Sequence, residues 1–259
     1  MTEFSRDNLT VRIYNSSSEM GAAAAADIAT KVRVLLGQAD SLGMIFAAAP
    51  SQNEMLAALV TEPEVDWARV DAFAMDEYVA VGADSPYSFA RYLDEHVFGK
   101  LPFRSTNCIN ATAADMKVEC QRYADLITAR KPSVVCMGIG ENGHIAFNDP
   151  AVADFADPQK VKPVELDERC RQQQVNDAGF PSLEHVPTHG LTVTIPTLMA
   201  PAYRYCVVPG VRKRDAVEAS IDGPVSEACP ASILRTKPGT ILYLDSESGA
   251  RYLEGAQCV

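Results

Sequence analysis

One stretch of the chain combines a histidine, a carboxylate and a glycine-rich turn in a way that favours proton-transfer chemistry. Residues 138–150 read Gly-Ile-Gly-Glu-Asn-Gly-His-Ile-Ala-Phe-Asn-Asp-Pro and follow an apolar run at 133–137. Closely spaced glycines allow positive φ and close approach of the backbone to a ligand. His144 is one of only four histidines, and imidazole is the side chain best matched to proton transfer near pH 7. With Asp149 close enough in sequence to fix its tautomer, His144 is a candidate catalytic residue; a histidine bonded only to a loop carbonyl is the alternative.

The same glycines also match the G-x-G-x-x-G pattern of dinucleotide-binding folds. That pattern requires its third glycine, here Gly143, to open a helix whose N-terminus holds the pyrophosphate. Pro150 would stop such a helix after about two turns, and residues 144–158 show no helical apolar stripe. We therefore rank nucleotide binding below a sugar- or acyl-type active site.

Two further candidates follow other apolar runs. Asp76 and Glu77 come directly after Phe73-Ala-Met75, where partial burial would raise a carboxyl pKa toward the range of a general base; a solvated loop carboxylate or a helix N-cap is the alternative. Three cations at 212–214 follow a strand-like segment at a predicted helix start. A helix N-terminus prefers negative charge, so Lys213 is predicted to hold an anion such as a phosphate; a solvated basic turn is the alternative.

Short apolar runs alternate with helical segments along the chain. Strands are predicted at 9–14, 44–48, 70–75, 133–137, 191–195, 204–208 and 240–244, and helices at 16–37, 52–60, 85–97, 116–130 and 212–221. This alternation predicts a doubly wound α/β fold, a mostly parallel sheet with helices on both faces in a three-layer α/β/α sandwich, forming one domain over 1–259. A TIM barrel is the competing architecture, but residues 145–190 break its required rhythm. Ligands bind beyond the carboxyl ends of such strands, where the three candidate segments fall.

The composition limits the classes of partner. With 23 basic against 34 acidic residues, a net charge of −11 and a pI near 4.8, neither nucleic acid nor an anionic membrane is expected as the main partner. Seven scattered cysteines without a C-x-x-C, and a polar N-terminal stretch without a signal-peptide core, predict a cytoplasmic protein with reduced thiols. Pro187 between His185 and His189 spoils the helical spacing of a metal site, so no metal is assigned.

Four segments, taken in order and at their spacing, resemble the glucosamine-6-phosphate deaminase/isomerase family, whose relatives include the 6-phosphogluconolactonases. They are Phe73-Ala-Met-Asp-Glu-Tyr78, residues 138–150, Leu191-Thr-Val-Thr194 and Gly210-x-x-Lys213. The resemblance implies a doubly wound α/β fold and conversion of an amino-sugar 6-phosphate to a ketose 6-phosphate with loss of ammonia. Lactonases tend to follow the glycine-histidine with threonine-alanine-serine, so the Gly143-His-Ile-Ala-Phe-Asn148 string favours the deaminases.

The resemblance also implies roles for individual residues. His144 would open the sugar ring, Asp149 would orient it, Asp76 would move the proton from C2 to C1, and Lys213 would hold the phosphate. The implied catalytic set is Asp76, Asn142, His144 and Asp149, and the implied binding set is Ala49, Pro50, Ser51, Gln52, Glu77, Gly143, Arg171, Gln174 and Lys213. No cofactor is required, since no hydride moves.

The chain departs from the family pattern at four places. Asn142 stands where many members have aspartate, and Asp149 where they usually have glutamate, a side chain longer by about 1.5 Å. Residues 48–51 replace a Gly/Ser-Thr phosphate loop, and 172–174 are glutamines where a phosphate-binding arginine is expected. The Asn142 change is mild, because asparagine also occurs in the family, whereas the shorter Asp149 can cost orders of magnitude in rate unless its loop compensates. The altered loop is stiffer, and the missing arginine weakens or re-aims phosphate binding, which leaves the preferred sugar open.

Three functions therefore compete. The first is an isomerase/deaminase acting on a hexosamine 6-phosphate. The second is a sugar-phosphate lactonase, in which His144 would activate water and Asp76 would not be needed as a carbon base. The third is a non-catalytic sugar-phosphate sensor. A small sugar phosphate is the expected partner in each case, and a homo-oligomer is compatible with the sequence, which does not fix the oligomeric state.

Overall fold

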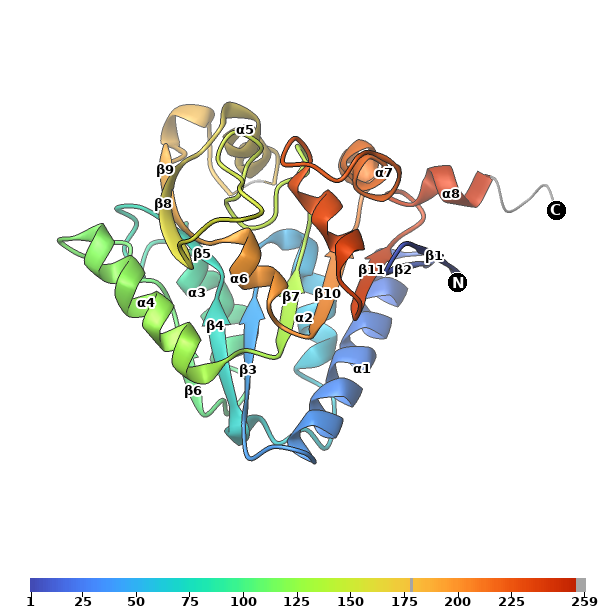
Figure 1. Cartoon of the computed structure of the whole chain (residues 1–259), viewed down its shortest axis with the longest axis horizontal. Coiled ribbons are helices and arrows are strands. Elements are labelled where there is room, and N and C mark those ends of the chain that lie inside the picture. The colour runs from blue at the N-terminus through green and yellow to red at the C-terminus, as the bar shows by residue number, and fades with distance from the viewer. Residues whose placement is uncertain (178, 255–259) are drawn as a thin grey trace.

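The computed structural model describes residues 1–177 and 179–254 and is built on an eight-stranded sheet (Figure 1). The strand order is β1-β2-β11-β10-β7-β3-β4-β6, and every pairing is parallel except that of β1 with β2. The strands are β1 (Thr2–Arg6), β2 (Leu9–Ile13), β3 (Leu42–Phe46), β4 (Val70–Ala74), β6 (Ser105–Asn107), β7 (Val134–Met137), β10 (Tyr203–Val208) and β11 (Thr240–Leu244).

Helices cover both faces of this sheet. On one face lie α1 (Ser17–Leu36), α2 (Asn53–Leu59) and α3 (Phe89–Leu93), which continues as a π-helical turn over Asp94–Phe98. On the other lie α4 (Met116–Arg130), α6 (Ile195–Met199) and α7 (Arg214–Asp222). Alternate strand residues divide between the two cores, because successive side chains of a strand point to opposite faces. The predicted doubly wound, mostly parallel fold is thus confirmed.

A smaller antiparallel sheet stands beyond the carboxyl ends of the parallel strands. It contains β5 (Asp76–Tyr78), β9 (His189–Val193) and β8 (Val161–Glu165), in that order, and α5 (Glu168–Asn176) lies beside it in Figure 1. The Val193 N–H donates to the Met75 carbonyl at 2.8 Å, and this hydrogen bond connects β9 to the end of β4. The last helix, α8 (Ala250–Glu254), lies near the edge formed by β1 and β2.

Most predicted elements are confirmed, and the differences have local causes. The helix at 116–130 and the strand at 240–244 have the predicted bounds, and Ser16 caps α1 by accepting from Glu19 N–H at 3.2 Å. The prediction that a helix opens at Ser85-Pro86 is wrong, because α3 begins only at Phe89. The strand predicted at 191–195 is β9, but it belongs to the small antiparallel sheet and not to the parallel one. The strands β1, β5, β6 and β8 were not predicted as separate strands. None of the described helices is long and apolar enough to cross a membrane.

Candidate active site

Four adjacent parallel strands bring the candidate segments together. In the order β10-β7-β3-β4, their carboxyl ends lead into Lys213, the glycine-rich turn, residues 47–52 and Asp76, respectively. The chain order reverses between β7 and β3, since β3 continues to β4 on one side and β7 to β10 on the other. Such a switch point opens a crevice at the carboxyl ends of the strands, which is where ligands bind in open α/β sheets.

A cavity occupies this crevice. Its wall is formed by Ala47, Ala48, Ala49, Ser51, Met75, Asp76, Phe89, Gly138, Ile139, Gly140, His144, Ala146, Phe147, Gln173, Gln174 and Lys213. Most of these side chains are apolar, so the few polar groups must determine what the cavity binds and which chemistry it performs.

The glycine-rich turn holds the His144 ring in one place. Gly143 has φ of +85°, a backbone conformation that side-chain-bearing residues rarely adopt. Gly140 packs flat against the imidazole: a Cβ at this position would lie 2.1 Å from His144 Cε1. The turn is closed by Gly140 N–H donating to the His144 carbonyl at 2.9 Å. Residues 144–150 form further turns and no helix, which agrees with the rejection of the dinucleotide motif.

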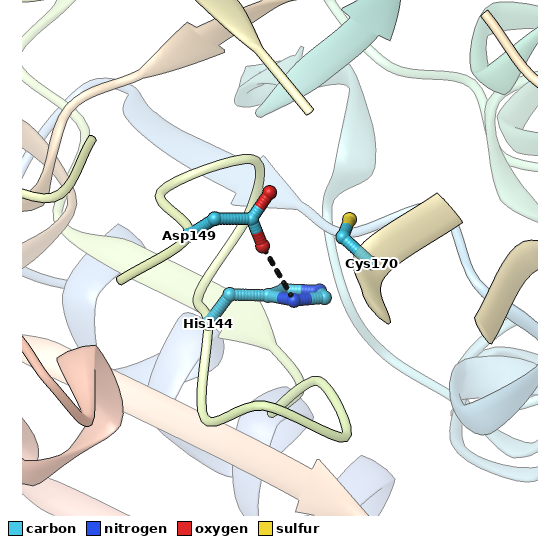
Figure 2. Close-up of side chains that lie close together, drawn as sticks. All are labelled: His144, Asp149 and Cys170. Carbon is cyan, nitrogen blue, oxygen red and sulfur yellow. Dashed lines mark ion pairs between the residues drawn. The ribbon is translucent and has the colours of Figure 1, made fainter. Parts of the chain in front are cut away.

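Asp149 and Asn142 both contact the His144 ring. Asp149 Oδ1 lies 3.1 Å from His144 Nδ1 (Figure 2), and Asn142 Oδ1 lies 2.7 Å from the same nitrogen. Burial alone would raise the pKa of Asp149, but its hydrogen bond to His144, the charge of that ring and donors from Asn142 and the Asp167 backbone lower it. Asp149 is therefore ionised at neutral pH and can hold a proton on His144 Nδ1.

Asp167 supports this network and was not predicted as a site residue. Its Oδ2 accepts from Asn142 Nδ2 at 2.8 Å, which directs the amide oxygen of Asn142 toward the histidine. Its Oδ1 accepts from Cys170 N–H at 2.6 Å as the N-cap of α5, and its own N–H donates to Asp149 Oδ2 at 3.3 Å. An aspartate directly before a helical segment is a recognisable N-cap signal, but only the fold shows that this cap meets residue 142.

Asp76 lines the cavity itself and has a different environment from Asp149. It is 7% exposed, and its pKa is raised well above the ordinary value, first by burial and then by the negative charge of Glu77. No donor among the described residues bonds its carboxylate. A carboxyl in this state is suited to accept a proton from a substrate near neutral pH.

Glu77 points away from the cavity and fixes α3. Its carboxylate accepts from Ser88 Oγ at 2.8 Å and from the backbone N–H groups of Tyr78, Phe89 and Ala90 at 2.9–3.0 Å. These bonds place Phe89 on the cavity wall. They also satisfy the free N–H groups of the helix start, which explains why α3 begins there rather than at Ser85.

Lys213 supplies positive charge at one end of the cavity. It lies at the end of a 3₁₀ turn, Val211–Lys213, which leads into α7, and it is 6% exposed. Burial lowers the pKa of its ammonium, against the opposing charges of Asp177 and Glu141. Within residues 1–177 and 179–254 this ammonium forms no hydrogen bond or ion pair. The neighbouring Arg212, in contrast, is paired with Glu141 and Asp177 at 3.0 and 2.7 Å.

The remaining predicted binding residues divide into two groups. Ala49, Ser51 and Gln174 line the cavity, whereas Pro50, Gln52, Gly143 and Arg171 do not. Of the predicted catalytic residues, Asp76 and His144 line the cavity, and Asn142 and Asp149 lie behind the histidine. Gln52 is buried and donates to the Val207 carbonyl at 3.1 Å. Arg171 donates to the carbonyls of Leu183 and Val186 at 2.7 and 3.0 Å and so holds the loop after α5. Gln173, Phe89 and Phe147 also line the cavity. Phe147 stands in a segment that resembles the family and Gln173 in one that departs from it, but neither was predicted as a site residue, and no sequence signal pointed to Phe89.

Comparisons with known proteins give one family. A family model described as glucosamine-6-phosphate isomerases/6-phosphogluconolactonase matches residues 15–243. A glucosamine-6-phosphate deaminase of Bacillus thuringiensis is 35% identical over 208 residues, which are 80% of this chain and 76% of the relative.

Solved structures give the same fold. A structure described as a monomeric glucosamine-6-phosphate deaminase superposes with a TM-score of 0.84 at 25% identity, over 93% of this chain and 98% of the other. A 6-phosphogluconolactonase from Thermotoga maritima superposes with a TM-score of 0.74 at 18% identity, over 92% and 99% of the two chains.

Proposed function

Because the chain belongs to the glucosamine-6-phosphate isomerase/6-phosphogluconolactonase family, we propose that it converts a hexosamine 6-phosphate and water to a ketose 6-phosphate and ammonia. Glucosamine 6-phosphate and fructose 6-phosphate are the expected pair. The observation that carries the proposal is that Asp76 lies on the same cavity wall as His144 and Lys213. It is buried there, and no donor in the described part of the chain bonds its carboxylate.

The first step is opening of the sugar ring. His144, with Nδ1 held by Asp149 and Asn142, moves a proton between the anomeric and ring oxygens through its other ring nitrogen. The ionised Asp149 stabilises the imidazolium that exists during this transfer, as a buried carboxylate does for a catalytic histidine. The product is an open-chain amino aldehyde.

The second step moves a proton along the carbon chain. Asp76 takes the proton from C2, and the electron pair of that bond forms a C1–C2 double bond while the aldehyde oxygen gains a proton. Asp76 then returns its proton to C1, which leaves an iminium at C2. Water adds to this carbon and ammonia leaves, giving the ketose. General acid–base catalysis of this kind contributes ~10²–10⁴-fold in rate.

Lys213 binds the phosphate group of the substrate in the proposed reaction. Its ammonium is buried beside the cavity and has no carboxylate partner among the described residues, a state that costs free energy unless an anion binds. Ser51, Gln174 and the backbone after β3 line the same cavity and add hydrogen-bonding groups. With Arg171 and Arg212 both engaged elsewhere, the phosphate is held by one cation and several neutral groups.

Ammonia release from purified protein tests the proposal. Glucosamine 6-phosphate and galactosamine 6-phosphate are supplied in parallel to the wild type, Asp76→Asn and His144→Ala, and ammonia and ketose phosphate are measured together. We expect stoichiometric products from the wild type and a loss of ~10²–10⁴-fold in both variants. Folded protein that releases no ammonia from either sugar would refute the proposed reaction.

Deuterium exchange separates the deaminase from a lactonase. Lactone hydrolysis breaks no C–H bond, whereas the proposed reaction breaks the C2–H bond, so deuterium placed at C2 of the substrate must leave that carbon for C1 of the ketose or for solvent. We expect this loss of label from C2 in the wild type. Full turnover by Asp76→Asn would show that this carboxylate is not the carbon base, and hydrolysis of 6-phosphogluconolactone without ammonia release would assign the protein to the other branch.

A further inference from the structure

A cysteine completes a group of potential metal ligands at the catalytic histidine. One ligand atom each from His144, Asp149 and Cys170 lies within 4.8 Å of the other two (Figure 2). All three side chains are buried, with exposures of 8%, 0% and 1%. His144 and Asp149 come from the turn after β7, whereas Cys170 lies in the first turn of α5, so the fold and not the local sequence brings them together.

The geometry fits a tetrahedral ion. Zn²⁺ binds imidazole nitrogen and carboxylate oxygen at about 2.0–2.2 Å and thiolate sulfur at about 2.3 Å, so neighbouring ligand atoms lie roughly 3–4 Å apart. The 3.1 Å between His144 Nδ1 and Asp149 Oδ1 is already in this range. Bringing the sulfur onto the same ion requires a shift on the order of 1 Å, which a change of side-chain rotamer can supply.

The surrounding charge also favours a cation. Asp167 is a second carboxylate next to the three ligands, since its Oδ1 accepts from the Cys170 N–H at 2.6 Å and its own N–H donates to Asp149 Oδ2 at 3.3 Å. Among the described residues, His144 is the only basic side chain within 4.0 Å of the Asp149 carboxylate, and Asp167 has no ion-pair partner. A buried anionic pair of this kind is stabilised by a divalent ion, which also displaces the thiol proton.

We propose that His144, Asp149 and Cys170 form a Zn²⁺ site that switches the enzyme off. On binding, the Cys170 S–H loses its proton to solvent and a Zn–S bond forms. His144 loses its Nδ1 proton to solvent and takes one up at Nε2, so the ring stays neutral and donates an electron pair through Nδ1, while ionised Asp149 donates through Oδ1. The mixed nitrogen, oxygen and sulfur set selects a thiophilic ion such as Zn²⁺ over Mg²⁺. Two protein groups of the proposed reaction are then occupied by the metal, so binding and turnover exclude each other.

Cobalt absorbance tests the site without any turnover. Co²⁺ added to the metal-free full-length protein should give the near-ultraviolet charge-transfer band of a cobalt–thiolate bond, and one equivalent of Zn²⁺ should abolish it. Cys170→Ser and Cys170→Ala should lack the band. Cys108→Ser, which removes a half-buried thiol outside the trio, is the matched control and should keep it. Absence of the band in the wild type, or its persistence in both Cys170 variants, would overturn the assignment.

Inhibition supplies a second readout. Zn²⁺ should inhibit the wild type and Cys108→Ser, Mg²⁺ should not, and a chelator should restore activity. In Cys170→Ser and Cys170→Ala, which keep the catalytic groups, the Zn²⁺ concentration for half-inhibition should rise by more than ~10-fold, since even outer-shell changes at metal sites cost ~10–100-fold in affinity. Equal zinc sensitivity in all variants would refute the switch. Because the cobalt band needs no substrate, failure of this proposal is distinguishable from failure of the proposed reaction.

Discussion

Replacing Gly140 by alanine is expected to displace the His144 ring and to lower kcat by about two orders of magnitude. The added Cβ would lie 2.1 Å from His144 Cε1 and 2.3 Å from both ring nitrogens. Non-bonded carbon atoms rest at about 3.5–4.0 Å, so the ring must withdraw by more than ~1 Å. A misplacement of about 1 Å in a catalytic group can cost ~10²-fold in rate.

The backbone offers little room to absorb the new methyl group. Gly140 N–H donates to the His144 carbonyl at 2.9 Å, and Gly143 N–H donates to the Gly140 carbonyl at 3.0 Å, so the turn is closed on itself. Gly140 is not among the glycines with positive φ, and alanine is therefore acceptable to its backbone conformation. The damage should fall on the position of His144, with a smaller effect on folding.

The assay compares kcat and the midpoint of thermal unfolding for Gly140→Ala and Gly82→Ala. The control position has no heavy atom within 4 Å of the added Cβ, so its variant should retain wild-type kcat. A Gly140→Ala protein with kcat within about 2-fold of the wild type would show that the tight packing of Gly140 on the ring has no catalytic role.

Three further variants test the charges around the cavity. Asp76→Asn should be more stable than the wild type at pH 8, and the difference in stability should vanish near pH 4. The reason is that burial raises the pKa of Asp76 in the folded protein. The stabilising contribution of Asp76 is therefore complete only below the unfolded pKa of about 3.9, and it is lost as pH rises through the folded pKa. Thermal unfolding of both proteins across pH measures this, and a pH-independent difference would contradict it. Lys213→Met should raise KM for the sugar phosphate by roughly 10- to 100-fold, the equivalent of one charged hydrogen bond, without lowering thermal stability at pH 7; an unchanged KM would remove Lys213 from phosphate binding. Asp167→Ala should cost ~1 kcal/mol of stability, because α5 loses its N-cap. It should also lower kcat more than it raises KM, because Asn142 loses the acceptor that orients its amide. A fall in kcat no larger than the loss of stability explains would show that Asp167 only caps the helix.

The main sheet was predictable because its signals are local. Most of the parallel strands are short apolar runs, and β3, β4 and β7 are buried along their whole length. Several of the helices between them have helical spacing and recognisable caps, such as Asp115 before α4. The polar and partly exposed β6 has no such signal and was not predicted. The candidate site followed from the same logic, since the carboxyl ends of parallel strands share one edge. Asp76, His144 and Lys213 do line one cavity there.

The strand at 191–195 was predicted and is found in β9, but its place in a small antiparallel sheet was not predictable, because the pairings are distant and the partner strands β5 and β8 are short or polar. β8 alternates buried Val161 and Val164 with a proline and charged residues, and β5 pairs with β9 across more than a hundred residues, as Asp76 with Thr192. No local pattern reports such a contact. The direction of the Arg171 side chain was not predictable from the sequence either. Arg171 is near the cavity-lining residues Gln173 and Gln174 in the sequence, but its guanidinium donates to the carbonyls of Leu183 and Val186.

The two catalytic aspartates, Asp76 and Asp149, are chemically identical, but their environments give them different pKa values and different roles. Asp149 is fully buried, yet donors from His144, Asn142 and the Asp167 backbone lower its pKa, so it stays ionised and orients the ring. Asp76 is buried beside Glu77 with no donor from the described residues, and its pKa is raised, so it can gain and release a proton. Pairs of titratable groups whose surroundings push their pKa values apart take separate acid–base roles. Exchanging those surroundings should exchange the behaviour: a hydrogen-bond donor placed next to Asp76 would lower its pKa and weaken it as a carbon base, even though the carboxylate itself had not moved.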